Sequence, residues 1–377
     1  MSHFILPTEV LPHIFEELAC NDLRAVSLVS RAFRHEGQRI IFRHARGLVL
    51  GPDVQSTGAR FLDTIVNSPY RLPLSVHSLQ IHLRMYQISD RHKVTLVRKL
   101  ERALVLLVNL KTLRVLGSIF PLPHPLNPIM HTLLKCTFQL HSFEWEFSDG
   151  DELLTSKFIR QQRKIRDLAF TGASKLDNQH VFEGLGHQLE SFSGEIGFIA
   201  SVMKGVDVFK GSSPLKCLRT TRSGHQYVVG NEFLPLTVLS YVLSSVRILH
   251  FTHDAFCVGL RLIDLAKFLR KLTLLWFKIQ YLREVNEEFY DALQQLSKLQ
   301  ILILQIPHMN YIALDAIAET VFSYCPNLRY MDVQSLWNFS ERYTRTPGET
   351  GSCQSQTLTS NEEEYSWALR HHFITDN

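Results

Sequence analysis

The sequence has few of the features that mark an enzyme, a metal site or a disulfide-rich secreted protein. Only six of its 377 residues are cysteine, and no two of them form a CxxC pair. Such sparse cysteines argue against a zinc module or a disulfide framework and favour a reducing compartment. The chain also lacks a GxxxxGK phosphate loop, GxSxG and HExxH motifs and a complete GxGxxG loop, and its 18 histidines are scattered rather than set at metal-ligand spacing. We therefore expect no catalytic residue, no cofactor and no bound metal.

The sequence is equally poor in charge of one sign and in long apolar runs. Its 40 Lys and Arg residues against 36 Asp and Glu leave a formal charge of +4, which is too slight to predict binding to nucleic acid or to an anionic membrane. The longest uncharged apolar stretch near the middle of the chain, residues 103–110, falls well short of the roughly 20 residues that a membrane span requires. The N-terminus has no basic leader of the kind that begins a signal peptide. We expect no nucleic-acid or membrane partner, and a cytoplasmic and/or nuclear location.

What the sequence does contain is enough apolar residues for a large core. Hydrophobic residues make up 45% of the chain and charged residues 20%, well outside the range of disordered chains. A length of 377 residues suits one large unit and one small one. Near the end, residues 340–360 are polar and predict a loop. After this loop, Tyr365, Trp367, Leu369 and Phe373 indicate a short final element that caps the last repeat.

Three short helical patterns occupy the first 45 residues. Apolar residues at positions 10, 11, 14, 15 and 18 recur at helical spacing, and Asn21 or Asp22 can cap a second helix. A third helical stretch contains Phe33 and Ile40 among several arginines. A unit of about 40 residues is marginally stable alone and usually packs against a partner or a neighbouring domain.

The same residues resemble an F-box. The resemblance rests on the strings Leu6-Pro7-x-Glu9-Val10-Leu11-x-x-Ile14-Phe15-x-x-Leu18, Asp22-Leu23 and Leu28-Val29-Ser30-Arg31-x-Phe33. It covers residues 5 to about 45, with Ser30 where a Cys is common and Phe33 where many members carry Trp or another large aromatic. It implies a docking module for the Skp-type adaptor of a cullin–RING ubiquitin ligase. By carry-over, the apolar contacts with that adaptor would come from Leu6, Pro7, Val10, Leu11, Ile14, Leu18, Leu28, Val29 and Phe33.

Physical chemistry agrees with a docking role for this segment. A helix that places anchors at positions i, i+4 and i+8 in an apolar groove is a common mode of recognition. The alternative is that the helices form only an N-terminal cap on the large domain, which leaves the ordered LPxE start unexplained.

A repeated pattern runs from residue 76 to residue 339. The frame apolar-x-x-apolar-x-apolar occurs in ten copies whose second apolar residues, the core anchors, lie 23 to 34 residues apart. Leucine-rich repeats have a period of about 20–29 residues. The residue directly after the first apolar position is polar in all ten copies and charged in seven. The anchors are Leu79, Leu113, Phe143, Leu168, Phe192, Leu218, Leu249, Leu272, Leu302 and Met331.

Each copy predicts a short strand, a loop and a returning helix. Turn residues such as Pro326 and Asn327 precede the anchors, and helix-compatible stretches such as 93–107, 284–296 and 313–322 lie between them. Stacked copies form a parallel sheet with helices on the other face, because no copy can bury its apolar side alone. This portion resembles the divergent leucine-rich repeats that often follow an F-box. The Asn expected after each strand is absent from five copies, which carry Arg84, Ser118, Ser148, Ser223 and Asp254.

The predicted fold is an all-α three-helix F-box followed by an α/β leucine-rich-repeat solenoid, with parallel strands on the concave face and helices on the convex face. We assign residues 1–45 to the F-box, 46–75 to a linker and N-terminal cap of the repeats, 76–339 to the array, and 340–377 to a polar loop and C-terminal cap or tail. Side chains alternate along a strand, so the residues between core positions point to the concave face. The predicted substrate-binding set on that face is Gln80, Arg114, Glu144, Ser193, Arg219, His250, Thr273 and Asp332.

The sequence favours a non-catalytic substrate receptor of a Skp–cullin–F-box ubiquitin ligase. In this hypothesis the F-box binds the Skp-type adaptor, and through it the cullin–RING ligase, while the repeats bind an unknown protein substrate. The alternative is an interaction scaffold of the same build without ubiquitin-ligase output. A third class, an enzyme with a site on the repeat face, is disfavoured because no acid–base constellation is recognisable.

Overall fold

The chain divides into two compact units, residues Met1–Gln188 and Leu189–Asn377, which we call the first and second units. The computed structural model describes residues 10–53, 56–68, 71–84, 88–117, 128–146, 152–171, 182–194, 199, 202–203, 215–220, 236–252, 262–279, 285–306, 314–334, 340–346 and 353–357.

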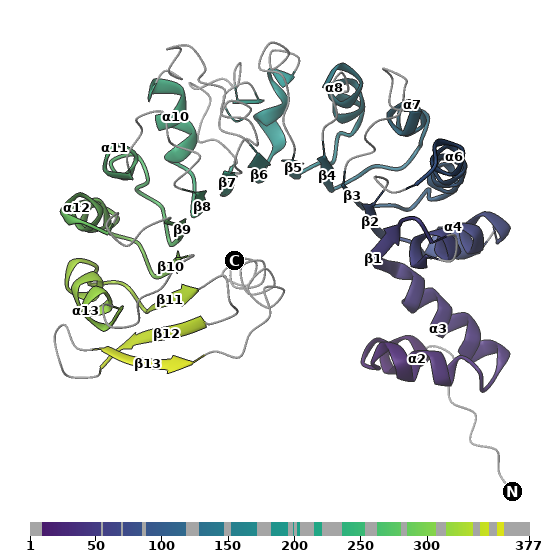
Figure 1. The fold of residues 1–377 in the computed structure, drawn as a ribbon, viewed down its shortest axis with the longest axis horizontal. Helices are drawn as coiled ribbons and strands as arrows, with labels where there is room; N and C mark the ends of the chain where they lie inside the picture. The colour runs from purple at the N-terminus through teal and green to yellow at the C-terminus, as the bar shows by residue number, and fades with distance from the viewer. Residues whose placement is uncertain are drawn as a thin grey trace, which may run out of the picture. The chain divides into compact units, whose positions relative to one another are not determined.

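The first unit begins with the three helices that the sequence predicts. They are α1 (Leu11–Glu16), α2 (Cys20–Val26) and α3 (Arg31–Arg43), and α3 leads directly into the first strand (Figure 1). The strands are β1 (His44–Leu50), β2 (Ser78–Leu83), β3 (Thr112–Leu116), β4 (Ser142–Glu146) and β5 (Asp167–Thr171), each parallel to the next. The helices between them are α4 (Thr57–Asn67), α5 (Leu72–Ser75), α6 (Asp90–Leu106), α7 (Pro128–Leu133) and α8 (Glu152–Gln161), and the 3-10 helix η2 (Leu185–Gln188) ends the unit.

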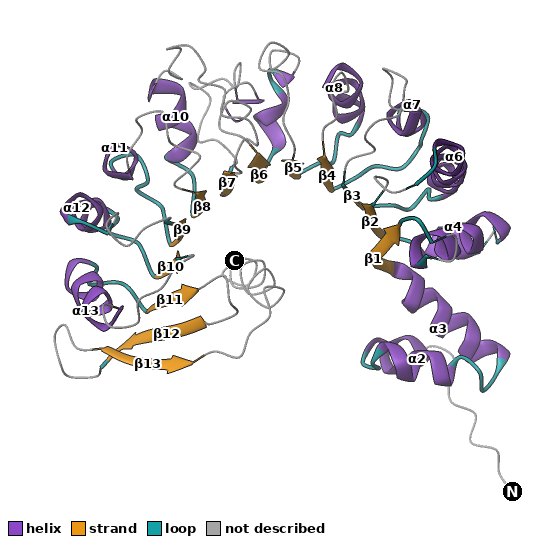
Figure 2. Ribbon diagram, viewed as in Figure 1, coloured by secondary structure: helices purple, strands orange, loops and turns teal. Residues whose placement is uncertain are grey.

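The second unit repeats this alternation. Its parallel strands are β6 (Ser191–Gly194), β7 (Cys217–Thr220), β8 (Ile248–Thr252), β9 (Leu274–Lys278), β10 (Ile301–Gln305) and β11 (Tyr330–Gln334). Its helices are α10 (Leu236–Leu243), α11 (Leu262–Ala266), α12 (Glu287–Gln295) and α13 (Leu314–Tyr324). Within each unit these helices lie along one side of the sheet (Figure 2). We call the other side of each sheet its open face.

The backbone register confirms nine of the ten predicted core anchors. Leu79, Leu113, Phe143 and Leu168 are successive partners in the first unit, and each is at most 1% exposed. In the second unit five more anchors are at most 2% exposed, namely Phe192, Leu218, Leu249, Leu302 and Met331. The anchors thus form one continuous apolar row in each unit, which is the burial that stabilises a stacked repeat.

The tenth anchor, Leu272, is wrong by three residues. The strand partner of both Leu249 and Leu302 is Leu275. Leu272 lies before β9, where it is fully buried at the position that Leu299 occupies before β10. The frame matches equally well on Leu269-Leu272-Leu274 and on Leu272-Leu275-Phe277, so the apolar pattern alone left two registers open.

Main-chain hydrogen bonds join successive repeats within each unit. The carbonyl of the residue just before a strand accepts two successive N–H groups from the next repeat. The Lys111 carbonyl, for example, accepts from His141 (2.7 Å) and Ser142 (3.1 Å). We call this arrangement the repeat joint. It recurs at the carbonyls of His77, Lys111, His141, Glu190, Lys216, Arg247, Thr273 and Gln300.

Polar side chains four residues before the anchors add a second link between repeats. Asn109 donates to the Leu74 carbonyl at 2.8 Å, Ser245 to the Leu215 carbonyl at 2.9 Å, and Asn327 to the Ser297 carbonyl at 2.7 Å. These side chains bind backbone carbonyls of the preceding copy, and the bond made by Ser245 is buried, where an unpaired carbonyl would be costly. The array therefore has polar ties before its strands, whereas the sequence comparison looked for an Asn after them.

Two predicted connecting segments contain strands. Residues 46–75 include most of β1, which pairs with β2, and helices α4 and α5. The sequence pattern missed β1 because its register shifts between Ala45 and Leu48, where Gly47 has a positive φ of 63°.

At the other end, residues 340–360 were predicted as a loop but contain β12 (Ser340–Arg345) and β13 (Cys353–Thr357), which continue antiparallel from β11. The predicted end-cap residues lie outside the described residues. A search of the described helices found none with both the length and the apolar character of a membrane-spanning segment.

Candidate functional site

The N-terminal helices are held in place by a cap and by a close helix contact. Ser30 caps α3 by accepting the Phe33 N–H at 3.1 Å. Gly37 of α3 faces Ser27 so closely that an added Cβ would lie 2.1 Å from the Ser27 hydroxyl oxygen. Ser27 in turn donates to the Leu23 carbonyl at 2.6 Å. A residue without a side chain at position 37 therefore sets the distance between α2 and α3.

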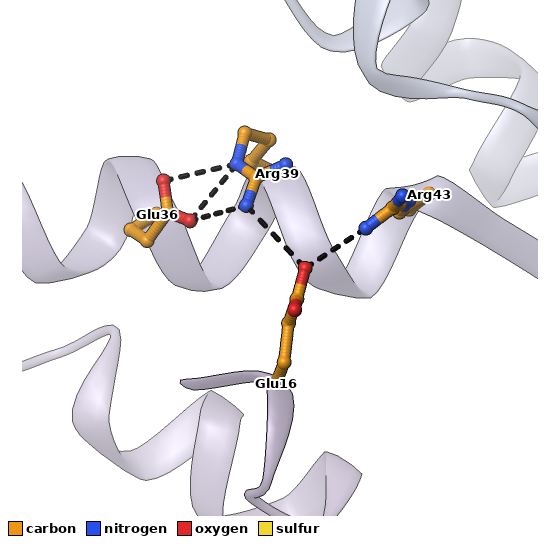
Figure 3. Close-up of polar contacts among 4 residues, drawn as sticks. All are labelled: Glu16, Glu36, Arg39 and Arg43. Carbon is orange, nitrogen blue, oxygen red and sulfur yellow. Dashed lines mark hydrogen bonds and ion pairs between the residues drawn. The ribbon is translucent and has the colours of Figure 1, made fainter. Parts of the chain in front are cut away.

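An ion-pair network joins α1 to α3. Glu16 contacts Arg43 at 2.9 Å and Arg39 at 4.0 Å, and Glu36 binds the Arg39 guanidinium through Nε at 2.9 and 3.0 Å (Figure 3). The hydrogen bond with Glu36 raises the pKa of Arg39, against a smaller lowering by burial. Since these side chains are one-third or more exposed, apart from Glu36, the network orients α1 more than it stabilises the fold.

A small apolar core lies between the three helices. Leu11, Phe15 and Leu23 are at most 5% exposed, and the Phe15 and Phe33 rings meet edge to face at 5.4 Å. Five further side chains pack against this core, namely Leu18, Val26, Phe33, Ile40 and Ile41. Of the predicted adaptor contacts, Leu11 thus belongs to this core, and Leu18 and Phe33 are partly buried against it. Apolar residues at helical spacing serve a core and a docking surface alike.

Four other predicted contacts do lie on the surface. Val10 is 41% exposed, Ile14 42%, Leu28 77% and Val29 71%. Four large apolar side chains exposed within 20 residues are more than the isolated ones expected on any surface. We call Val10, Ile14, Leu28 and Val29 the N-terminal apolar surface. The remaining predicted contacts, Leu6 and Pro7, lie outside the described residues.

The open face of the first unit carries predicted residues that pair with one another. Gln80, Arg114 and Glu144 are successive register partners on β2, β3 and β4. Arg114 and Glu144 form an ion pair at 3.4 Å, with side chains 25% and 22% exposed. The Gln80 amide lies 3.1 Å from the His82 ring. This row is polar, half-buried and of mixed charge.

The second unit places its predicted residues less uniformly. Ser193, Arg219 and His250 are successive register partners on β6, β7 and β8. Thr273 does not continue this row: it precedes β9 and donates its hydroxyl to the Arg247 carbonyl at 3.0 Å, a consequence of the three-residue register error. Trp276 holds the corresponding strand position, and its ring stacks on that of His250 at 4.4 Å.

Asp332 is on the open face but is completely buried. Both of its carboxylate oxygens accept from the Arg342 guanidinium of β12, at 2.7 and 2.8 Å. Arg342 also lies over the Tyr330 ring, 4.1 Å from its centroid. The pair holds β12 against β11. Sequence reasoning expected Asp332 to be available to a ligand, whereas its carboxylate is occupied by Arg342.

Sequence reasoning missed an apolar cluster on the same face. Leu274, Ile301 and Ile303 form its buried part, and Ile248, Trp276 and Tyr330 pack around them. We call these six residues the open-face cluster. Their signal was the departure from alternation in β9 and β10, where apolar residues occupy both sides of the strand.

The pKa of His250, which stacks on Trp276, is lowered. Burial, then the charges of Arg219 and Lys278, lower the pKa of His250 to about 3, so its ring is neutral at physiological pH. Within the described ranges no three His, Cys, Asp or Glu side chains are grouped so as to hold a metal ion.

Comparison with known proteins gives one family match. Residues 4–39 match the F-box-like family, which covers the three N-terminal helices up to Arg39. A search of curated proteins found no match.

Solved structures with a similar path of the chain are distant in sequence. A chain in the crystal structure of the yeast Rad7–Elc1 complex is 15% identical, with a TM-score of 0.45, and the match covers 86% of this chain and 88% of that one. The leucine-rich-repeat-containing protein LegL7 from Legionella pneumophila is 13% identical, with a TM-score of 0.39, and the match covers 77% of this chain and 91% of LegL7. Both similarities are too low to support functional inference.

Proposed function

Because residues 4–39 form an F-box-like domain and α/β repeats follow it, we propose that the chain is a non-catalytic substrate receptor of a Skp–cullin–F-box ubiquitin ligase. In this role the N-terminal helices bind the Skp-type adaptor, and the open faces of the repeats bind a client protein. The cullin and its RING subunit are reached through the adaptor.

The N-terminal apolar surface is the observation that carries this proposal. Val10, Ile14, Leu28 and Val29 are exposed beside a helical core that already has its own apolar residues. Burying a large aliphatic side chain contributes about 1.5–3 kcal/mol, so exposed residues of this kind favour an apolar partner. A helical surface fitted into an apolar groove is a familiar recognition mode.

The proposed contribution of the repeats is proximity. A client held on the open face lies near a ubiquitin thioester brought by the ligase, and transfer to a client lysine then behaves as a step within one complex. Holding two reactants in this way replaces a bimolecular encounter with an effectively unimolecular reaction. The repeats need no reactive group of their own for this role.

The first experiment measures association with a Skp-type adaptor by co-purification and titration. We expect the double variant Leu28→Asp/Val29→Asp to weaken binding at least about a hundredfold, because two exposed apolar contacts are replaced by charges. The matched control is Leu153→Asp on α8, which alters an equally exposed leucine (68%) outside the N-terminal helices. Adaptor binding that survives the double variant, or that is lost equally in the control, would refute the docking surface.

A second experiment separates the ligase from the scaffold without ubiquitin transfer. Reconstituted adaptor, cullin and RING subunits are mixed with the chain and a client found by proximity labelling, with the chain lacking residues 1–45 as control. Ubiquitin on the client that depends on residues 1–45 supports the receptor role. Adaptor and cullin binding with no ubiquitin transfer would favour the scaffold.

A further inference from the structure

The last strand of the second unit, β13, has no partner on its outer side among the described strands. All five of its residues pair with β12, without a shift of register. Gln354, Ser355, Gln356 and Thr357 are exposed, and Cys353 is half-buried. An edge of this kind presents a row of backbone N–H and C=O groups with which another strand can pair.

The other terminal strand, β1 of the first unit, is protected by devices that β13 does not have. The register of β1 shifts between Ala45 and Leu48, where Gly47 has a positive φ. The Thr57 hydroxyl of α4 also accepts the Val49 N–H at 3.3 Å, so this amide is already bonded. Bulges, charges, prolines and covering elements discourage the addition of a strand. The strand β13 has no bulge, no proline and no charged residue, so its edge is open to such an addition.

Helix α13 places two exposed carboxylates beside this edge. It packs on β13, and its residues Asp315 and Glu319 lie one helical turn apart. Burial, then the charges of Glu319 and Asp315, raise the pKa of Cys353, so both carboxylates act on the strand. Neither forms an ion pair with a described residue. Arg345, the register partner of Cys353, donates instead to carbonyls at the C-terminal end of α13.

The spacing of the two carboxylates matches the spacing of side chains on an added strand. Residues i and i+4 of a helix lie about 6 Å apart along its axis. Alternate residues of a strand lie about 6.6 Å apart, and they project to the same face of the sheet. Asp315 and Glu319 therefore favour a strand that carries Lys or Arg at two alternate positions on the side of α13.

We propose that an extended segment of a partner protein pairs with the free edge of β13 as a further strand, with Lys or Arg side chains at alternate positions beside Asp315 and Glu319. Backbone hydrogen bonds attach the segment, and the carboxylates select a basic one, which is recognition by strand addition. The identification of this segment with a client rests on the proposed function, whereas the edge itself does not.

Fluorescence anisotropy with the full-length chain at physiological salt tests this proposal. The probe is a short labelled peptide in which threonine and lysine alternate. One control peptide has the same sequence with every backbone amide N-methylated, and the other alternates threonine and glutamate. We expect both controls to bind at least about tenfold more weakly than the probe. In hydrogen exchange the probe should protect alternate amides of residues 353–357, because only every second residue of a strand points its N–H to one side.

Neutralising the carboxylates then tests the selection of a basic segment. Asp315→Asn/Glu319→Gln should weaken probe binding about fivefold, a modest effect because exposed ion pairs contribute little each. The matched control is Glu287→Gln/Asp291→Asn on α12, which neutralises two exposed carboxylates at the same helical spacing away from the edge. This control should leave the affinity for the probe unchanged.

Four results would overturn the proposal. They are a probe that does not bind, an N-methylated peptide that binds as well as the probe, an equal loss of affinity in the α12 control, and protection of β13 that rises with the concentration of the chain alone. The last result would assign the edge to a second copy. Adaptor binding is measured in the same variants, whose N-terminal helices are unaltered, so the edge and the proposed function can fail separately.

Discussion

The pair formed by Asp332 and Arg342 allows a prediction in which the two single variants behave differently. Asp332 is 0% exposed, whereas the Arg342 side chain is 32% exposed. Arg342→Met leaves a buried carboxylate without its guanidinium, and breaking a buried pair in this way costs about 3–5 kcal/mol. Because Arg342 is partly solvated, we expect the lower end of that range, about 3 kcal/mol.

The reverse change should be milder. Asp332→Leu removes the buried charge and leaves Arg342 able to turn toward water, so we expect a cost of about 1 kcal/mol. The double variant Asp332→Leu/Arg342→Met replaces the pair by apolar side chains and should lie within about 1 kcal/mol of the unaltered chain. The coupling between the two sites would then be about 3 kcal/mol.

Native-state hydrogen exchange of residues 340–345 measures these costs locally. A local readout is needed because a chain with two compact units need not unfold in one step. We expect exchange of β12 to accelerate strongly in Arg342→Met and only slightly in the double variant. Equal acceleration in both single variants, or none in Arg342→Met, would show that the pair does not hold β12 to the sheet.

Two further predictions concern single positions. In urea unfolding, Gly117→Ala should destabilise the first unit by at least about 2 kcal/mol more than Gly47→Ala does. Both glycines have a positive φ (94° and 63°), which costs about 1–2 kcal/mol for alanine, but only at Gly117 would the new Cβ meet a backbone atom, 2.2 Å from the Leu83 carbonyl oxygen. Equal costs for the two variants would contradict this clash. The pKa of His250 is lowered from 6.5 to about 3, so its contribution to the free energy of unfolding should be fully present above pH 6.5. It should fall as the pH drops toward 3, by at most about 1.4 kcal/mol per pH unit, because the unfolded chain takes up the proton first. His250→Gln should flatten this slope between pH 6.5 and 4.5, and an unchanged slope would exclude His250 as its source.

The repeat architecture could be predicted from the sequence because it depends on a spacing. Anchors such as Leu113 and Phe143 must be buried in every copy, and that demand leaves a periodic trace whatever the intervening residues are. The prediction fails where the chain departs from the period. The bulge at Gly47 hides β1, and the leucines at positions 269, 272, 274 and 275 permit two frames around β9.

The surfaces were harder to predict than the core. Leu11 and Ile14 are both apolar and lie on the same short helix, yet the first is 5% exposed and the second 42%. Which of them faces the inside depends on how α1 packs against α3, and spacing along one helix does not contain that information. The buried Asp332 illustrates the same limit, since its partner Arg342 lies ten residues away in a segment whose polar composition resembles a loop.

The repeat joint has a consequence for how such a protein can change over time. Each joint is made by one carbonyl and two amides, groups that every residue except proline possesses. Mutation can therefore replace almost any side chain along this border and leave the stacking of neighbouring units intact. Substitutions can therefore change the surface that the protein presents while the backbone scaffold stays the same.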